Sequence, residues 1–545
     1  MAISKEQIEK IVSRGQELND NNAPWQSYFQ DLAKYCLPRK AWITSQKSKG
    51  EKLKLNEVYD STGIRALKIM AAGFHSNLTN PASKWFNLRT RDLKTMEEKD
   101  AQLWFNDVED IMFGTLASSN FDTTMQEFYL NAGCFGTGTI LTLEDVEEKV
   151  RFTEIPIEQV AFEEDAYGRV NRVYRTFPLT AQQAFDLWGE SAGEAVKEIV
   201  KKKPNESMKF LHYVAPRDSR EAGKANSKNM PYMSLWIELS HKHLIGEGGF
   251  NDNPYAVGRF YKDTSDVFGF SPAMDVLPDL RLVQAQVKTM LRASMKAADP
   301  ALIAPRKGFI APLNANPGQI NYYDKKNADD RVEAFPNGGN FQLTIEVIKE
   351  TQANIEKAFF VPLFQAISTI TKQMTVPEVQ RRISENMVLL GPVVGRFTQE
   401  MLDPIVLRVF DILYRGGHLP PPPPSIQGQD MDVVYIAPLA RAQKESEVYS
   451  IQSFMQDVGL IAQANPAVID KINTDKMVDD IAVIRGISPD LIKDDAEVEQ
   501  VRQQRAEQQA QMAQQQAMAQ MAQTADAGAS AEKQLAEAEA TKEGE

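Results

Sequence analysis

Residue types that could hold a metal ion are sparse in this chain. The sequence contains five histidines and two cysteines among 545 residues. His241 and His243 alternate in a segment with strand character, so they are expected to point to one face of a strand. Two imidazoles could begin a metal site, but no cysteine or carboxylate pattern completes it. We therefore expect an ordinary solvated pair here, and neither a metal nor a cofactor.

Known nucleotide-binding and nucleophile motifs are also missing. No G-x-x-x-x-G-K-[ST] occurs, and FGTGT at 135–139 lacks the third glycine and the lysine of a phosphate loop. That stretch is more typical of a tight turn into a strand. Neither a G-x-S-x-G elbow nor a Cys–His signature is present. We expect a protein that is not an enzyme.

One lysine stands apart from the ordinary surface lysines. Lys372 is the cation of an otherwise uncharged segment, 362–373, which has no clear periodicity. A cation held on a mobile loop could touch a phosphate backbone and release it. A solvated lysine on a surface loop is the plainer alternative.

Several devices for starting a helix coincide directly after this lysine. Thr375 and Glu378 form a T-x-x-E capping box, in which each side chain satisfies a backbone N–H. Met374 and Val379 fit a hydrophobic staple, and Pro377 fits the first helical turn. The pattern predicts the boundary between a loop and a helix near residue 375.

The helix that starts there could persist to Tyr414, but two prolines lie inside it. Pro392 and Pro404 each remove a backbone donor and clash with the preceding turn. Kinks are expected near 388–391 and 400–403. The sequence Arg-Gly-Gly at 415–417 is a typical helix end.

A second group of cations lies on a predicted helix that begins at Ser271-Pro272 and ends before Pro300. Its apolar stripe consists of Leu280, Val283, Val287, Met290 and Leu291, and its cations on the opposite side are Arg281, Lys288, Arg292 and Lys296. Lys288, Arg292 and Lys296 carry the same two interpretations as Lys372. Pro278 allows a bend near the start of the helix.

The remaining segments give a mixed N-terminal part and a helical C-terminal part. Helices are predicted at 4–35, 61–79, 96–117, 121–132, 180–189, 342–361 and 440–498; strands are predicted at 137–144, 149–156, 169–177, 209–216, 232–245 and 431–438. A polyproline spacer occupies 419–425. From about residue 499 a tail rich in Gln, Ala and Met is expected to be helical at first and then disordered.

Composition limits the class of protein further. The apolar content of 43% and the charged content of 25% are ordinary for a globular protein, and no apolar run is long enough for a membrane span. The two cysteines, Cys36 and Cys134, favour a reducing compartment and free buried thiols over a disulfide. A net charge of −13 argues against tight binding to nucleic acid, although a few local cations could still touch it briefly.

Several extended stretches resemble the portal proteins of bacteriophages, most of all the head-to-tail connector family of short-tailed (podovirus-type) phages. The likeness is carried by 58–88, 131–145, 258–284 and 374–382, and it spans about residues 10–515. It implies an α+β fold, predominantly helical: the portal fold, with wing, stem, clip and crown regions assembled into a ring.

The resemblance also divides the chain into regions. It implies an N-terminal α+β wing domain (1–270), stem helices (271–299 and 342–361), a clip (300–341), a tunnel loop (362–374), a long kinked wing helix (376–415), a crown (416–498) and an acidic C-terminal tail (499–545). Lys372, Lys288, Arg292 and Lys296 then become candidate contacts to DNA in the channel. Lys307, Lys325 and Lys326 become candidate clip contacts to a terminase or a tail adaptor.

The function implied is a ring at one capsid vertex, probably of twelve copies, through which double-stranded DNA is packaged and ejected. Its implied partners are other copies of itself, the terminase large subunit, the major capsid and scaffolding proteins, the tail adaptor and the internal ejection proteins. The implied location is the portal vertex of the virion, with the host cytoplasm during assembly.

Two other classes of protein compete with this interpretation. One is a monomeric α/β enzyme with a helical appendage, for which the sequence shows no pocket of titratable groups. The other is a non-portal virion scaffold or adaptor, suggested by the long helices and the tail. The α+β region at 1–270 is too large and too rich in strands for a simple rod. The size of the oligomer discriminates among the three.

Overall fold

A computed structural model describes residues 3–45, 57–91, 99–218, 220, 226–298, 302–303, 333–334, 341–368, 390–429, 431–436, 451, 453–462, 472–485, 493 and 497–518. The chain forms two compact units. Unit 1 comprises Met1–Arg91, Phe105–Pro422 and Asp430–Phe454, and unit 2 comprises Asp92–Trp104, Pro423–Gln429 and Met455–Glu545. None of the described helices is long and apolar enough to cross a membrane.

The N-terminal helices follow the predicted pattern with one break. They are α1 (Lys5–Asn21), α2 (Ala23–Cys36), α3 (Thr62–Leu78), α5 (Lys99–Ser118) and α6 (Phe121–Phe135), with a short 3-10 turn, η1 (Pro38–Lys40), after α2. The helix predicted over 4–35 divides at Asn22, which ends α1 and begins α2, because Pro24 occupies the first turn of the second helix.

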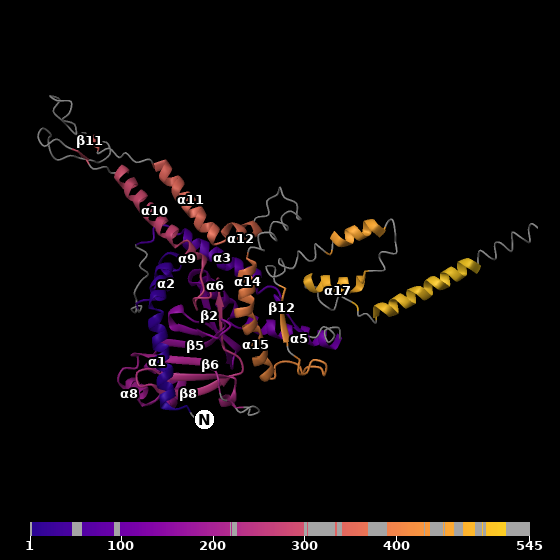
Figure 1. Cartoon of the computed structure of the whole chain (residues 1–545), viewed down its shortest axis with the longest axis horizontal. Coiled ribbons are helices and arrows are strands. Elements are labelled where there is room, and N and C mark those ends of the chain that lie inside the picture. Colours follow the sequence, from indigo (N-terminus) through magenta and orange to yellow (C-terminus); the bar gives the residue numbers. More distant parts are fainter. Residues whose placement is uncertain are drawn as a thin grey trace, which may run out of the picture. The chain divides into compact units, whose positions relative to one another are not determined.

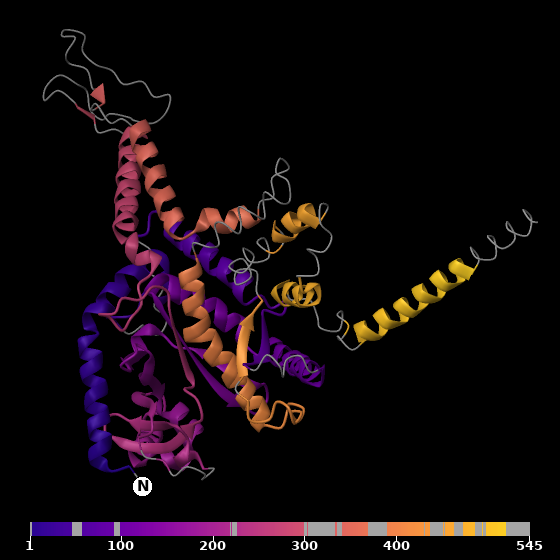
Figure 2. The same ribbon diagram turned by 45° about the vertical axis from the view of Figure 1, so that its right-hand side comes forward.

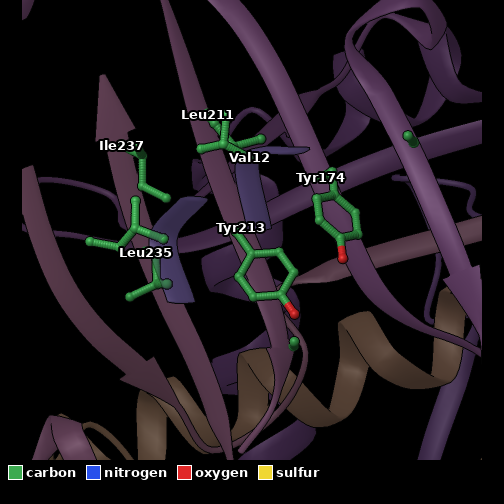
Figure 3. Close-up of a cluster of buried hydrophobic side chains, with 9 residues drawn as sticks. Val12, Tyr174, Leu211, Tyr213, Leu235 and Ile237 are labelled. Atoms are coloured by element: carbon green, nitrogen blue, oxygen red, sulfur yellow. The ribbon is translucent and has the colours of Figure 1, made fainter. Parts of the chain in front are cut away.

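A five-stranded antiparallel sheet forms the outer layer of unit 1. Its strands, in spatial order, are β4 (Val160–Glu164), β5 (Val170–Thr180), β6 (Ser207–Pro216), β7 (Tyr232–Glu238) and β8 (His243–Phe250). Figure 1 shows α1 running along this sheet. Figure 3 shows that Val12 of α1 meets side chains from three strands, among them Leu211 and Leu235.

The opposite face of the sheet is covered by α7 (Ala181–Trp188) and α8 (Glu194–Lys202), separated by η3 (Gly189–Ala192). Phe177 and Phe210 pack against these helices. The predicted start of α7 at Thr180 is confirmed, because its hydroxyl accepts from the N–H of Gln183 in a complete capping box.

The strand predicted over 232–245 is confirmed at both ends, but a turn divides it into two strands. β7 ends at Glu238 and β8 begins at His243. The buried Glu238 carboxylate accepts hydrogen bonds from the backbone N–H groups of Ser240 and His241, at 2.7 and 2.8 Å. Since His241 lies in this turn, the two histidines do not share a face of one strand.

A three-stranded antiparallel sheet packs beside α6, in the order β3 (Lys149–Glu154), β2 (Thr137–Asp145) and β9 (Tyr255–Arg259). Between α6 and β2, Gly136 has a φ of 74° and donates its N–H to the carbonyl of Ala132. A Cβ there would lie 2.1 Å from the carbonyl oxygen of Gly269. The tight turn into a strand predicted at 135–139 is thus confirmed, with glycine required at 136.

A buried aromatic cluster joins helices from distant parts of the chain. The ring of Phe74, on α3, lies 6.0 Å from Tyr129 on α6 and 5.7 Å from Phe260, centroid to centroid. It also lies 5.4 Å from Phe364 on α12 (Val361–Ser368) and 5.6 Å from Phe397 on α14 (Gly391–Phe397). Edge-to-face contacts of this kind add to the apolar burial.

A two-stranded ribbon crosses one of the predicted region boundaries. β1 (Phe86–Thr90) pairs antiparallel with β12 (Met431–Tyr435), and Leu88 lies opposite Val433. This pairing joins a strand of the predicted wing to a strand of the predicted crown, and the boundary at residue 416 stays a prediction. An isolated strand must pair its backbone groups, and β1 supplies the partner.

The remaining described elements are short or belong to unit 2. In unit 1 they are η2 (Ile157–Gln159), η4 (Ser227–Asn229), and the antiparallel pair β10 (Leu302–Ile303) and β11 (Glu333–Ala334); in unit 2 they include α17 (Thr474–Arg485) and a helix at 497–518. Within unit 2 the guanidinium of Arg502 pairs with Asp475 at 2.8 Å. The rest of the predicted tail lies outside the described residues.

A buried carboxyl group supports β1 from α5. Glu109 is only 6% exposed, and its carboxylate accepts a 2.7 Å hydrogen bond from the N–H of Leu88. Burial raises the pKa of Glu109 to about 7, although the N–H of Leu88 and the charge of Lys84 oppose the shift. At neutral pH the folded protein therefore carries a carboxyl group that is costly to ionise.

The pKa shift predicts how stability changes with pH. A carboxyl pKa raised by folding stabilises the folded state at low pH, and this contribution is lost as pH rises through about 7. The variant Glu109→Gln keeps an acceptor for Leu88 without the charge. We expect its unfolding free energy, relative to the wild type, to be higher at pH 8 than at pH 5 by on the order of 2 kcal/mol. Denaturant unfolding at both pH values measures this, and an equal difference at both would contradict it.

Candidate functional site

The two predicted stem helices form a hairpin. Figures 1 and 2 both show α10 (Leu277–Ala298) and α11 (Phe341–Ala358) running side by side. The helix start predicted at Ser271 is confirmed, since its hydroxyl accepts from the N–H of Met274 at 3.2 Å. The helix is broken at Val276, however, so that a single turn, α9 (Pro272–Asp275), precedes α10.

Apolar side chains anchor the base of the hairpin. On α10, Leu280 and Val283 are fully buried, and on the returning side Ile355 and Phe359 are fully buried as well. The end of α10 that leads to 299 is mostly exposed. Since the free energy of burial scales with the apolar area removed from water, these side chains hold the hairpin at its base.

A polar cluster fixes the two helices relative to each other at this base. The side-chain oxygen of Gln284 accepts hydrogen bonds from the N–H groups of Tyr59 and Asp60, at 2.6 and 2.8 Å. Its amide nitrogen donates to the carbonyl of Asp60 at 2.8 Å. The carboxylate of Asp60 in turn accepts from the side-chain nitrogen of Gln352 on α11, at 2.7 Å. Asp60 therefore links Gln284 of α10 to Gln352 of α11.

Gln284 is not among the residues predicted from the sequence, although a signal for it exists. It is a polar residue within the apolar stripe of the helix, next to Val283, and it is only 6% exposed. A buried amide without partners would cost about 1–3 kcal/mol. A polar residue at such a position therefore indicates a specific partner, but the sequence does not say which one.

The structure places the predicted cations of α10 in different surroundings. The ammonium of Lys288 lies 5.4 Å above the ring of Tyr59, and the side chain is half-buried. Arg292 and Lys296 are exposed. On the same side, Arg281 forms a 2.6 Å ion pair with Asp31 of α2. Contact of Lys288, Arg292 or Lys296 with DNA stays a prediction.

Much of the predicted tunnel loop and clip lies outside the described residues. This holds for Lys372 and the helix start Met374, Thr375, Pro377, Glu378 and Val379, and for the clip cations Lys307, Lys325 and Lys326. The predicted start of the tunnel loop at residue 362 does change. Residues 362–368, predicted as loop, continue the helix α12. Phe364 explains this, because it is buried against Gly73 of α3, where a Cβ would lie 2.3 Å from the Phe364 ring.

Both prolines of the predicted long helix are described. Pro392 is the second residue of α14, and Pro404 is the second residue of α15 (Asp403–Arg415). Between them lies η5 (Thr398–Leu402), a π-helical segment that overlaps the second predicted kink position at 400–403. Prolines are tolerated in a first turn, and π-helical turns relieve backbone conflicts. The bends themselves stay predictions.

A buried ion cluster ties this π-helical segment to the sheets. Arg259 of β9 is 2% exposed and forms ion pairs with Glu164 of β4 and with Glu400 of η5. The Glu400 carboxylate accepts from the backbone N–H, the Nε and the Nη2 of Arg259, at 3.1, 3.0 and 2.7 Å. Three elements far apart in the sequence are thereby joined by one guanidinium group.

A second buried arginine anchors the next part of the helix. Arg408 of α15 is 3% exposed and donates from Nε to the carbonyl of Thr142 at 2.8 Å. Its guanidinium also lies 4.9 Å from the ring of Phe250. Burial lowers the pKa of Arg408 to about 10, which still leaves it charged at neutral pH.

The histidines and cysteines in the described part of the chain are spread over several elements. No cluster of three or more histidine, cysteine or carboxylate groups suited to a metal occurs among the described residues. Cys36 and Cys134 are free and buried, as the sequence predicts. His243 points to the carbonyl of Ser191 at 3.3 Å. The features that can act are therefore the charged hairpin and the helix tied to the sheets.

The chain is similar in sequence to known proteins over most of its length. The model of a family described as bacteriophage head to tail connecting protein matches residues 9–492. The chain is 30% identical over 520 residues to a probable portal protein of Bordetella phage BPP-1, covering 92% of each chain. It is 29% identical over 508 residues to a portal protein of Salmonella phage epsilon15, covering 92% of this chain and 91% of the relative.

One solved structure gives a weaker match. A chain in the neck of an empty gene transfer agent particle shares 12% identity with this chain. The match covers 72% of this chain and 86% of that chain, with a TM-score of 0.34, which is too low to carry an argument.

The ion cluster at Arg259 predicts a large difference between two substitutions on the same helix. Glu400→Ala removes two hydrogen bonds from the buried guanidinium of Arg259 and one from its backbone N–H, so we expect a loss of about 2–4 kcal/mol in unfolding free energy. Arg396→Ala removes only a 2.9 Å pair to Glu400 from a side chain that is 34% exposed, and should cost less than about 1 kcal/mol. Denaturant unfolding of both variants measures this. Equal losses would contradict the assigned role of the cluster.

Proposed function

The chain belongs to the family of bacteriophage head-to-tail connecting proteins, and from that premise we propose that it acts as the portal of a phage capsid. In this role it forms the opening at one vertex through which the genome enters and leaves. The observation that carries the proposal is the similarity to two portal proteins over more than nine-tenths of the chain. Its place in the virion is the portal vertex, and it assembles there from the host cytoplasm.

The portal is a closed ring of this chain, of about twelve copies. Rings of this kind are built from a heterologous interface that closes by rotation. The α10–α11 hairpin forms the stem around the channel, residues 300–341 form the clip, and 362–374 form the tunnel loop, whose helical beginning at 362–368 is anchored by Phe364. The clip, with Lys307, Lys325 and Lys326, contacts the terminase large subunit and later the tail adaptor.

Double-stranded DNA passes through this channel without being held. A net charge of −13 supports sliding, because a strongly basic lining would neutralise many phosphates and bind the duplex tightly. Lys372 supplies brief contacts from the tunnel loop. The packaging energy comes from the terminase, since the chain carries no nucleotide-binding motif. The capsid, scaffolding and internal ejection proteins complete the set of partners.

The particle mass tests the ring directly. We expect light scattering of the purified chain to give about twelve times the 61.1 kDa of one copy, and negative-stain images to show a central hole. A stable monomer or dimer at every protein concentration would refute the portal role. An elongated particle without a hole would favour a scaffold or adaptor instead.

Substitution of the tunnel-loop lysine tests the contact with DNA. Lys372→Ala should leave the ring intact and lower the amount of packaged DNA several-fold, because each copy loses one phosphate contact. Lys202→Ala is the control, since Lys202 is an exposed lysine of α8 that is paired only with Glu198 of its own helix. Nuclease-protected DNA in a packaging assay is the measurement. Equal packaging by both variants would show that Lys372 does not contact DNA in the channel.

A further inference from the structure

The two cysteines of the chain meet inside unit 1, although they lie far apart in the sequence. Cys36 is the last residue of α2, and Cys134 is the residue before the last of α6. Both are free, and neither is more than 1% exposed. The thiol of Cys134 is hydrogen-bonded to the thiol of Cys36. The fold therefore places two reduced sulfur atoms next to each other.

Two further contacts between the same segments lie on either side of the thiols. Phe29 of α2 packs against Phe135 of α6, with ring centroids 5.6 Å apart. Lys40 of η1, just beyond α2, donates to the side-chain oxygen of Asn131 of α6 at 3.2 Å. In each segment the cysteine lies between the two contacting residues. The neighbouring backbones are thus held together on both sides of the thiol pair.

The contact between the thiols calls for more explanation than their burial does. Free cysteine is among the most buried residue types and packs as a small apolar side chain. A buried side chain touches only about 6–12 others, however, so two cysteines seldom meet without a constraint. Adjacent thiols also differ chemically from other small side chains, because the loss of two hydrogen atoms joins their sulfurs covalently.

The pair lies close to the surface of the protein. Burial, followed by the hydrogen bond to Cys36, raises the pKa of the Cys134 thiol, while the charge of Lys40 opposes this shift. Since the thiolate is the reactive form, oxidation should be slow in the closed fold. The side chain of Lys40, which is near enough to act on Cys134, is itself 31% exposed. A local opening at the end of α2 is therefore sufficient to admit a small oxidant.

We propose that Cys36 and Cys134 form a reversible disulfide within one chain, which joins α2 to α6. A peroxide supplies the oxidising power. The thiolate of one cysteine attacks a peroxide oxygen, which gives a sulfenic acid and one water. The sulfur of the other cysteine then attacks the sulfenic sulfur and releases a second water. Two S–H bonds and the O–O bond break, one S–S bond forms, and the peroxide is reduced.

The bond would stabilise the packing of α2 against α6. A cross-link between distant positions of the sequence reduces the freedom of the unfolded chain, and a long loop gains the most. The thiols stay reduced in a cytoplasm and can be oxidised outside it. In the proposed portal role the chain passes from the host cytoplasm into a released virion, and only this biological setting rests on that function. The bond itself requires no assembly.

Peroxide treatment of the purified full chain tests the bond. After denaturation, the thiols that react with an alkylating reagent should fall from two to none, and mass spectrometry of a digest should show the peptides of Cys36 and Cys134 joined. A denaturing gel without reductant should show a single-chain band. The temperature of half-unfolding should rise by roughly 2–6 °C, and dithiothreitol should reverse the rise.

Substitutions separate the bond from other effects of peroxide. Cys36→Ala and Cys134→Ala should each abolish the joined peptide and the reversible rise in unfolding temperature. The double variant, with both cysteines replaced by alanine, reports the oxidation of the 20 methionines, which dithiothreitol does not reverse. An equal reversible rise in this variant would overturn the proposal.

The remaining outcomes also decide for or against the bond. Two thiols that still alkylate after peroxide, under conditions that oxidise the urea-unfolded chain completely, would refute it. Sulfinic acids on separate peptides, or covalent dimers on the gel, would refute it as well. The joined peptide in a chain that forms no ring would support the bond and refute only the portal role, whereas rings without the joined peptide would refute only the bond.

Discussion

The buried amide of Gln284 imposes the constraint on which the functional geometry depends. An amide inside the fold must find partners for its oxygen and its nitrogen, and here the backbone of Tyr59 and Asp60 supplies them. The carboxylate of Asp60 also accepts a hydrogen bond from Gln352, so the same cluster includes α11. One polar cluster thus links two helices separated by more than forty residues of sequence.

The long helix is held by a different kind of contact. Phe397 enters the aromatic cluster around Phe74, and Glu400 meets the guanidinium of Arg259. Packing alone tolerates small shifts along a helix, whereas a buried ion pair with several hydrogen bonds tolerates little displacement. The π-helical segment at Thr398–Leu402 contains Glu400 and lies between Phe397 and Pro404. The aromatic packing and the buried ion pair therefore act on neighbouring residues of one helical stretch. The predicted long helix is thereby tied to the three-stranded and the five-stranded sheet.

Charge has two distinct roles in this molecule. The net charge of −13 acts at long range, while the individual ion pairs act at contact distance. Arg281 illustrates the second role, because it sits on the basic side of α10 yet pairs with Asp31 of its own chain. A cation on this helix can therefore be engaged by an acidic residue of its own chain.

The sequence by itself determined the features that depend on neighbouring residues. The caps at Thr180 and Ser271 and the glycine turn at Gly136 are local, because each is completed within four residues. The extended likeness to phage connectors likewise lies in the order of residues, and it predicted the family that the comparisons established.

Only the tertiary structure decided which distant residues meet. The pairing of β1 with β12, the contact of Arg259 with Glu400 and the shared partner of Gln284 and Gln352 join segments of very different sequence position. The turn at His241 also escaped prediction, because the alternation of residues continues through it and the buried Glu238 that closes it looks like any other strand residue. A local pattern states that a polar group needs a partner, but the path of the chain in space selects that partner.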